Sequence, residues 1–141
     1  MEMRFFATTL ENLSAFAESL SPTALPLNTG CCPCESGVTA TGMLHRYNPR
    51  HADVLVVAGA LSIKAAPVVR RIYDQMPSPK YVLGVGTCAK TGGLFGDSYA
   101  VVGKLSDILP VDVFVRGCPP SAADFSAAVA ELKKKIGKDG R

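Results

Sequence analysis

The sequence lacks an apolar run long enough to cross a bilayer. The longest run, Val54 to Leu61, is only eight residues, whereas a membrane-spanning helix needs about 20. A signal peptide is also missing, because Glu2, Glu11 and Glu18 interrupt the N-terminus and no basic stretch precedes an apolar block. These absences predict a protein of the cytosol, where thiols remain reduced.

A strong charge of one sign is absent as well. The 141 residues carry a formal net charge of +3, which is too weak to predict a nucleic-acid partner. Part of the excess lies in the C-terminal stretch from Lys133 to Arg141, as expected for a solvated helix end. Because 48% of the residues are apolar, the chain can form one domain with a buried core.

Signatures of common catalytic sites are missing. The glycine-rich stretch from Gly84 to Gly96 has neither the G-x-x-x-x-G-K-S/T nor the G-x-G-x-x-G phosphate-binding form. The sequence shows no Ser/His/Asp constellation and no carboxylate pair, and His45 and His51 are isolated imidazoles expected at partner contacts or on the surface. No catalytic residue is therefore expected in this chain.

Three apolar runs have the composition of strands buried on both faces. They are residues Asp53 to Ala58, Tyr81 to Val85 and Val111 to Val115. A helix with Pro67 in its first turn is expected between the first two runs and ends at Pro77. One face of that helix carries Val68, Val69, Ile72, Tyr73 and Met76. A short helix is also expected from about Gly37 to Arg46.

The last helix is expected to begin at Pro119-Pro120-Ser121. Ser121 can cap it, and Asp124 stands at the capping-box spacing in place of the usual Glu. Its core-facing residues are predicted to be Phe125, Val129, Leu132 and Ile136. Strands that alternate with helices predict a mostly parallel sheet covered on both faces, which is a flavodoxin-like three-layer α/β/α sandwich.

The chain is expected to have three parts: an N-terminal docking segment at residues 1–26, a domain at 27–136 that contains all five cysteines and a basic tail at 137–141. The docking segment carries a helical apolar stripe from Phe6 to Leu20. This stripe either docks on a partner protein or packs on the chain's own sheet.

The cysteines give the main functional signal, and their odd number argues against a disulfide framework. Cys31, Cys32 and Cys34 follow apolar Leu27, whereas Cys88 and Cys118 each follow a predicted strand. The carboxyl ends of parallel strands lie along one edge, so three loops can bring these cysteines together. Thiolates on glycine-rich loops suit one [4Fe–4S] cluster at that edge.

Three other interpretations of the cysteines stay open. Structural zinc more often shows two C-x-x-C pairs. A thioredoxin-type redox site would use Cys31, Pro33 and Cys34, but would leave Cys88 and Cys118 unexplained. Five unrelated buried cysteines would be expected within helices and strands, and not in loops rich in glycine and proline.

Three segments resemble a known family. Residues 29–36 (T-G-C-C-P-C-E-S), 86–93 (G-T-C-A-K-T-G-G) and 111–120 (V-D-V-F-V-R-G-C-P-P) are similar to the cysteine motifs of nickel–iron hydrogenase small subunits. The same family includes the cluster-bearing 20 kDa subunit of respiratory complex I. The resemblance covers roughly residues 27–136 and implies a [4Fe–4S] cluster held by Cys31, Cys34, Cys88 and Cys118.

The resemblance separates into two branches. Complex I subunits use adjacent cysteines in a C-C-x-x-E motif, and hydrogenase small subunits use C-x-x-C. The spacing of Cys31 and Cys34 favours the hydrogenase branch, since the glutamate position of the other motif falls on Gly37 when it is counted from Cys34. Cys32 stands where compact relatives have another residue, so it could replace a neighbouring ligand.

The implied function is electron transfer without bond chemistry in this chain. The subunit would hold the cluster nearest the active site of a membrane-associated, energy-converting [NiFe]-hydrogenase that reduces protons to hydrogen. The implied partners are the large Ni–Fe subunit, a ferredoxin-like polyferredoxin subunit and membrane subunits that hold the chain at the cytoplasmic side of the membrane. The alternative is a complex I-type subunit that passes electrons to quinone. Glu35 beside the cluster would serve a proton route or a structural hydrogen bond.

Overall fold

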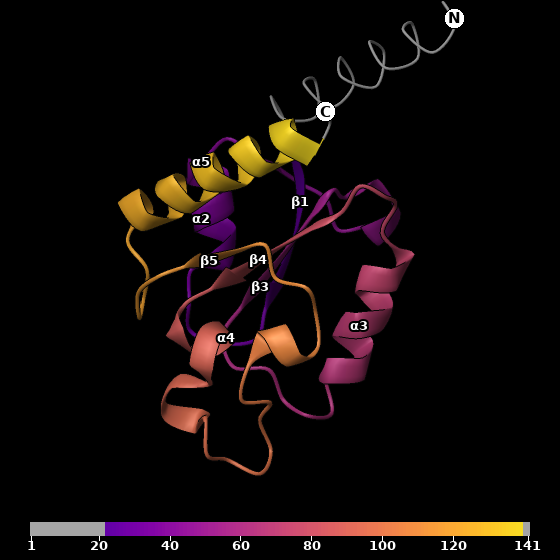
Figure 1. Cartoon of the computed structure of the whole chain (residues 1–141). Helices are drawn as coiled ribbons and strands as arrows, with labels where there is room; N and C mark the ends of the chain where they lie inside the picture. The colour runs from indigo at the N-terminus through magenta and orange to yellow at the C-terminus, as the bar shows by residue number, and fades with distance from the viewer. Residues whose placement is uncertain (1–21, 140–141) are drawn as a thin grey trace, which may run out of the picture.

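A computed structural model describes residues 22–139 (Figure 1). The predicted helical stripe from Phe6 to Leu20 lies outside the described residues, as do Gly140 and Arg141. Within the described part of the chain, no helix is both long and apolar enough to span a membrane.

Five parallel strands form one sheet in the order β2-β1-β3-β4-β5. They are β1 (Thr23–Asn28), β2 (Leu44–His45), β3 (Val54–Ala58), β4 (Tyr81–Val85) and β5 (Val113–Val115). The chain moves to one side of β1 to form β2 and then crosses to the other side for β3. This reversal creates a switch point between β1 and β3, where ligands of parallel α/β sheets bind outside the carboxyl ends of the strands.

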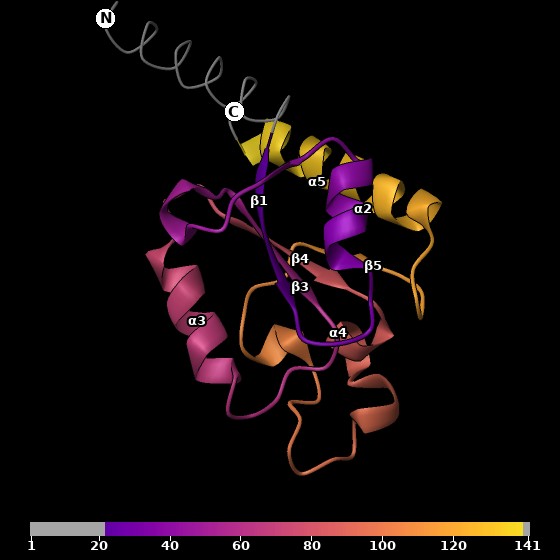
Figure 2. The same ribbon diagram turned by 180° about the vertical axis from the view of Figure 1, so that it is seen from behind.

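Helices cover both faces of the sheet, as the two opposite views show (Figures 1 and 2). The helices α2 (Cys34–Ala40) and α5 (Ala122–Asp139) pack on one face, and α3 (Ala66–Gln75) and α4 (Thr87–Thr91) lie on the other. Three short 3-10 turns complete the chain: η1 (Pro49–His51), η2 (Gly93–Phe95) and η3 (Leu105–Asp107). The predicted three-layer α/β/α sandwich with a parallel sheet is confirmed.

The central strand β3 explains the longest apolar run in the sequence. All five of its side chains are buried. Val54 and Val56 point into the core beneath α2 and α5, whereas Leu55 and Val57 point into the core beneath α3. A strand that is buried on both faces has no solvent-facing position, so its sequence shows no polar alternation.

The start of α5 matches the capping box predicted from the sequence. Ser121 Oγ accepts a hydrogen bond from the Asp124 backbone N–H at 3.2 Å, and the Asp124 carboxylate accepts one from the Ser121 N–H at 3.2 Å. The predicted core positions of this helix are all buried: Phe125, Val129, Leu132 and Ile136. The capping box places the beginning of α5 directly after the Cys118 loop.

The structure differs from expectation at β1, at α2 and at β2, which was expected to be helical, and β5 begins at Val113 and not at Val111. The strand β1 was not predicted, because Pro22 and Pro26 suggested a break in the chain. In the structure, β1 pairs with β2 only at Thr23 and Ala24. Position 26 therefore needs no N–H group on the side that faces β2, and proline is tolerated there. The helix expected from about Gly37 to Arg46 instead spans Cys34–Ala40. It ends early because Gly42 adopts a φ of +73° and turns the chain toward β2.

Candidate metal centre

The carboxyl edge of the sheet, defined as the loops that follow β1, β3, β4 and β5, carries four of the five cysteines. Cys31 and Cys32 follow β1, Cys88 lies in the first turn of α4 directly after β4, and Cys118 follows β5. The β1 loop crosses the switch point in close contact with the β3 loop. A Cβ atom on Gly30 would stand 2.9 Å from the Cα of Gly59, so only glycine permits this approach.

Cys32 differs from the other cysteines of this edge in its burial. Its side chain is buried, whereas Cys31 and Cys118 are exposed and Cys88 is half-buried. Burial raises the pKa of the Cys32 thiol, and the neighbouring sulfurs of Cys31, Cys88 and Cys118 raise it further. The structure therefore places Cys31, Cys32, Cys88 and Cys118 on three loops at one edge of the sheet. Three of these four are ligands expected from the sequence, and Cys32 is the additional cysteine.

Cys34 has different surroundings, although it is only two residues away. Its side chain is fully buried in the core on the α2 side of the sheet, and its Sγ contacts the Val56 carbonyl oxygen at 3.9 Å. Burial raises the pKa of the Cys34 thiol to about 12, with smaller contributions from Glu35 and Cys32. At neutral pH this thiol is protonated, and it packs like a small apolar side chain.

Glycines keep space free beside two of the sulfurs. A Cβ atom on Gly86 would stand 2.7 Å from Cys32 Sγ, and one on Gly93 would stand 2.8 Å from Cys88 Sγ. Both glycines adopt positive φ angles, +87° and +54°. The Cys88 and Cys118 loops are joined by a hydrogen bond from the Thr87 N–H to the Gly117 carbonyl at 3.2 Å. The edge thus forms a cradle that a side chain at either glycine would fill.

The donor set of this cradle suits an iron–sulfur cluster. Its donors are all thiols, which are the usual ligands of such clusters. Among residues 22–139, no three Cys, His, Asp or Glu side chains stand close enough together to chelate a single metal ion. A zinc ion draws its sulfurs to within about 2.3 Å of one centre, whereas a cubane spreads its four ligands around a larger body. The thiol chemistry of this edge fits an iron–sulfur cluster, and the described residues hold no preformed site for a single metal ion.

Comparison with known proteins places the chain in a family. The family described as "NADH ubiquinone oxidoreductase, 20 Kd subunit" matches residues 35–132. This chain belongs to that family. The matched range includes Cys88 and Cys118 and begins directly after the cysteines of the β1 loop. Members of the 20 kDa subunit family are parts of oxidoreductase complexes and typically hold an iron–sulfur cluster.

A solved structure supports the same assignment. The chain is similar to one from the membrane-bound sulfane sulfur reductase (MBS), described as an archaeal respiratory membrane complex, with a TM-score of 0.75 and 26% sequence identity. The similarity covers 91% of this chain and 77% of the other chain. The family and the fold therefore agree with the resemblance seen in the cysteine motifs.

The position of Glu35 bears on the branch of the 20 kDa subunit family to which the chain is most similar. Glu35 is exposed in the first turn of α2, three residues after Cys32. Counted from Cys32, the sequence Cys31-Cys32-Pro33-Cys34-Glu35 completes the C-C-x-x-E motif of the complex I branch. Counting from Cys34 instead places the glutamate position at Gly37 and hides this match. The adjacent pair itself was the available signal.

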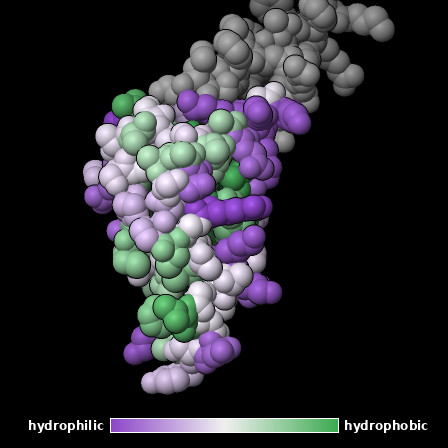
Figure 3. Space-filling view, turned by 90° about the vertical axis from the view of Figure 1, so that its left-hand side faces the viewer, coloured by the Kyte–Doolittle hydropathy of each residue, from purple (hydrophilic) through white to green (hydrophobic). Residues whose placement is uncertain are grey.

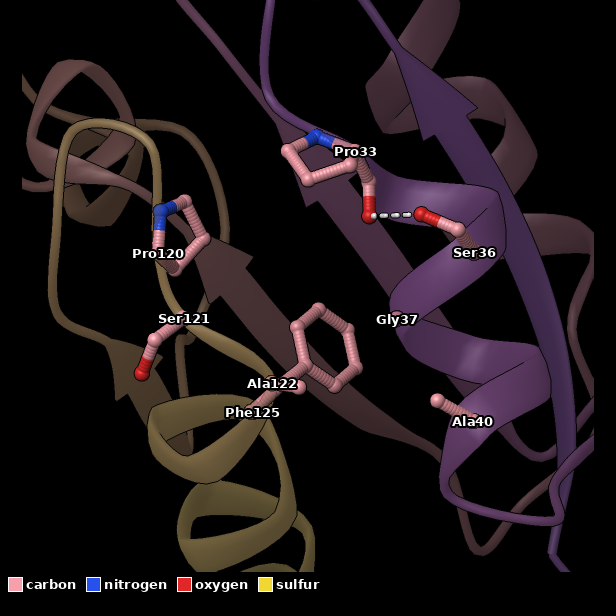
Figure 4. A pocket seen from close by; sticks show the side chains of 8 residues that line it. All are labelled: Pro33, Ser36, Gly37, Ala40, Pro120, Ser121, Ala122 and Phe125. Carbon is pink, nitrogen blue, oxygen red and sulfur yellow. Dashed lines mark hydrogen bonds between the residues drawn. The ribbon is translucent and has the colours of Figure 1, made fainter.

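A pocket beside the cradle was also missed. It has a volume of about 210 Å³ and lies between α2 and the start of α5 (Figure 4). Its walls are mostly apolar and are formed by Pro33, Ser36, Gly37, Ala40, Pro120, Ser121, Ala122 and Phe125. A Cβ atom on Gly37 would stand 2.7 Å from the Phe125 ring, so the glycine allows α2 and α5 to approach each other. No sequence motif signals this pocket, because its residues come from segments far apart in the chain.

Proposed function

We propose that this chain is the electron-relay subunit of a membrane-associated respiratory oxidoreductase complex and holds one [4Fe–4S] cluster on Cys31, Cys32, Cys88 and Cys118. The observation that carries the proposal is the position of Cys32, which is buried among the three other cysteines of the edge. Cys34 stood in the ligand set expected from the sequence. We replace it with Cys32 because its sulfur lies in the core.

When bound, the cluster supplies reversible one-electron transfer. The chain's own residues hold it and shape its surroundings. Cys32 and Cys88 would hold its inner side, next to Gly86 and Gly93. Cys31 is exposed and, with the exposed Cys118, would hold the side nearest to solvent. That side has to be covered by a partner subunit, which would bring a second redox centre close and keep water away.

The position of Cys32 also bears on the branch of the family. The hydrogenase assignment rested on the C-x-x-C spacing of Cys31 and Cys34. With Cys32 as the second ligand, the C-C-x-x-E pattern of complex I is complete at Glu35. The geometry therefore favours a complex I-like respiratory subunit, which passes electrons to quinone, over the energy-converting hydrogenase. The partners we propose are a large subunit, a ferredoxin-like cluster subunit and membrane subunits, at the cytoplasmic side of the membrane.

The hydrogenase remains the second candidate, supported by the compact chain and the intact C-x-x-C. Purifying the assembled complex separates the two. We expect inhibitor-sensitive quinone reduction, no nickel, and a cluster signal by electron paramagnetic resonance. Bound nickel together with hydrogen evolution from a reduced viologen would establish the hydrogenase instead. Normal iron content in both Cys88→Ser and Cys118→Ser complexes would overturn the cluster assignment for either branch.

A further inference from the structure

An exposed apolar surface lies at the carboxyl edge, next to the Cys88 loop. Leu94 is 95% exposed, Tyr99 94%, Phe95 54% and Ile63 53%. The two segments that carry these residues lie side by side, because the Ile63 N–H donates to the Ala100 carbonyl at 2.9 Å. Figure 3 shows hydrophobic atoms at the lower end of the molecule, where Figure 1 places the loop after α4. We call these four residues the loop surface.

The loop surface is displayed by an ordered backbone. Successive turns are closed by hydrogen bonds from the Phe95 N–H to the Gly92 carbonyl at 3.0 Å and from the Ser98 N–H to the Phe95 carbonyl at 3.0 Å. Gly92 has a φ of +77°, and a Cβ atom there would stand 2.5 Å from the Gly96 Cα. This backbone holds large apolar side chains in water, and a patch of that kind marks an interaction site.

The loop surface is continuous with the cluster cradle. Leu94 directly follows Gly93, whose missing side chain leaves space for the Cys88 sulfur. A protein docked on Leu94 would therefore lie beside the ligand loop of Cys88. Electron transfer requires two redox centres to be close, so docking at this position serves the relay function proposed above.

Charges around the loop surface indicate the chemistry of the partner. Lys64 directly follows Ile63, and residues 90–104, which carry Leu94, Phe95 and Tyr99, also contain Lys90, Asp97 and Lys104; all four charged side chains are exposed. Residues 62–64 and 90–104 together therefore carry three lysines and one aspartate, a net charge of +2. Complementary charges at the rim of an interface set orientation and partner choice. A matching surface would be apolar at its centre and carry Asp or Glu at its border.

We propose that the loop surface docks a permanent redox-partner subunit of the complex, through a contact that is apolar at its centre and rimmed by carboxylates. The inference rests on the proposed relay function. Tyr47 provides a matched control, since it is also exposed, at 74%, but lies near the amino ends of the strands. Its position is fixed by the neighbouring Arg46, whose N–H donates a hydrogen bond to the Ala24 carbonyl near the start of β1.

Photo-crosslinking in the assembled complex tests the proposal. A benzophenone amino acid replaces Tyr99 in one variant and Tyr47 in the other. We expect position 99 to link to a single redox subunit, at an apolar peptide bordered by Asp or Glu, and position 47 to give no link to that peptide. A link from position 99 to a second copy of this chain or to lipid, a link to a peptide rich in Lys and Arg, or no link at all would overturn the proposal.

A substitution pair measures how much the loop surface contributes. We expect the amount of the crosslinked subunit in the purified complex to fall about tenfold in the double variant Leu94→Ser/Tyr99→Ser. The reason is that buried aromatic and aliphatic anchors carry most of the binding free energy of an interface. Leu44→Ser/Tyr47→Ser should retain the subunit fully. Equal retention in both would overturn the docking site. The iron content of the unmodified complex is measured separately. A complex without iron would refute the relay proposal, whereas a complex with iron and equal subunit retention in both variants would refute the docking site alone.

Discussion

The amino edge of the sheet is tied together by side chains, whereas the carboxyl edge is shaped by glycines and cysteines. At the amino edge, the Asp53 carboxylate accepts hydrogen bonds from the Thr23 N–H at 3.1 Å and the Thr23 hydroxyl at 2.6 Å. The Asp112 carboxylate accepts one from the Val82 N–H at 2.8 Å. These bonds join neighbouring strands where they begin.

The carboxyl edge has side-chain bonds from hydroxyls, as from Thr29 to the Ala58 carbonyl at 2.8 Å and from Thr87 to the Gly117 carbonyl at 3.3 Å, but in the described part of the chain no carboxylate joins two of its loops. It holds five of the six described glycines with positive φ, namely Gly59, Gly86, Gly92, Gly93 and Gly117. Such loops contribute less to stability and leave space for a bulky cofactor. Under the proposed function, the carboxylate bonds that stabilise the sheet and the cofactor site therefore lie at opposite ends of the same strands. Substitutions at one end should change unfolding, and substitutions at the other should change the cofactor.

The largest effect is expected at the carboxyl edge itself. Cys32→Ala should reduce the iron bound by this chain to a small fraction, because Cys32 lies among the other three cysteines. Cys34→Ala should keep the iron and lower the free energy of unfolding by about 1 kcal/mol, since it removes one small group from the core. Iron analysis and electron paramagnetic resonance of both complexes provide the measurement. If Cys34→Ala loses the cluster and Cys32→Ala keeps it, Cys34 is the ligand, as the sequence alone suggested, and the proposed ligand Cys32 is wrong.

A glycine pair sharpens the comparison. Gly86→Ala should lower cluster content strongly, because its Cβ atom would meet Cys32 Sγ at 2.7 Å. Gly42→Ala is the control, since Gly42 also has a positive φ, +73°, but no atom lies within 4 Å of its added Cβ. Both variants should lose about 1–2 kcal/mol from backbone strain. The Gly86 variant alone should lose iron, and equal iron content in both variants would show that the cradle tolerates a side chain.

At the amino edge, the expected change is in stability alone. Asp53→Asn should lower the free energy of unfolding by about 1–2 kcal/mol, because it weakens charge-assisted bonds to Thr23. The cluster content should be unchanged. Chemical denaturation of the chain, followed by circular dichroism, gives the first quantity, and iron analysis of the complex gives the second. Loss of iron from the Asp53→Asn complex would contradict the claim that the amino edge affects stability alone.

The smallest effect concerns alkaline pH and the cluster-free chain. The folded pKa of Cys34 is raised from 9.0 to about 12, so the unfolded thiol ionises first as the pH rises. The stability that this thiol contributes is fully present below pH 9 and is lost between pH 9 and 12, at up to about 1.4 kcal/mol per pH unit. Denaturation at pH 8 and 10 should show the loss, and Cys34→Ala should reduce it. An identical pH dependence in both chains would contradict a buried, protonated Cys34.

Much of the fold could be predicted because its cause is local. The strand Tyr81–Val85 was predicted with its observed bounds, and Ser121 with Asp124 marked the start of α5. The strand β1 was missed because its prolines argue against a strand, and only the short pairing with β2 makes Pro26 tolerable. That pairing depends on the assembled sheet, which no local pattern contains.

The candidate site was predictable to the level of the loops. The order of strands and cysteines predicted that three loops meet at the carboxyl edge. The choice between Cys32 and Cys34 was not predictable, since the sequence contains both C-C and C-x-x-C. It depends on where α2 begins, because the first residue of this helix is Cys34 and its side chain enters the core. The exposure of Leu94 and Tyr99 likewise follows from the turn geometry of their loop.

The strand β5 has a consequence for the biosynthesis of the protein. It is the last strand among the described residues, it lies at the edge of the sheet, and it precedes Cys118. A nascent chain that has been translated only as far as α4 can offer Cys31, Cys32 and Cys88 but not the fourth proposed ligand. Under the proposed ligand set, full ligation of the cluster would follow the arrival of β5 at the sheet. Cluster loading would then report that this edge strand has been made and has folded into place.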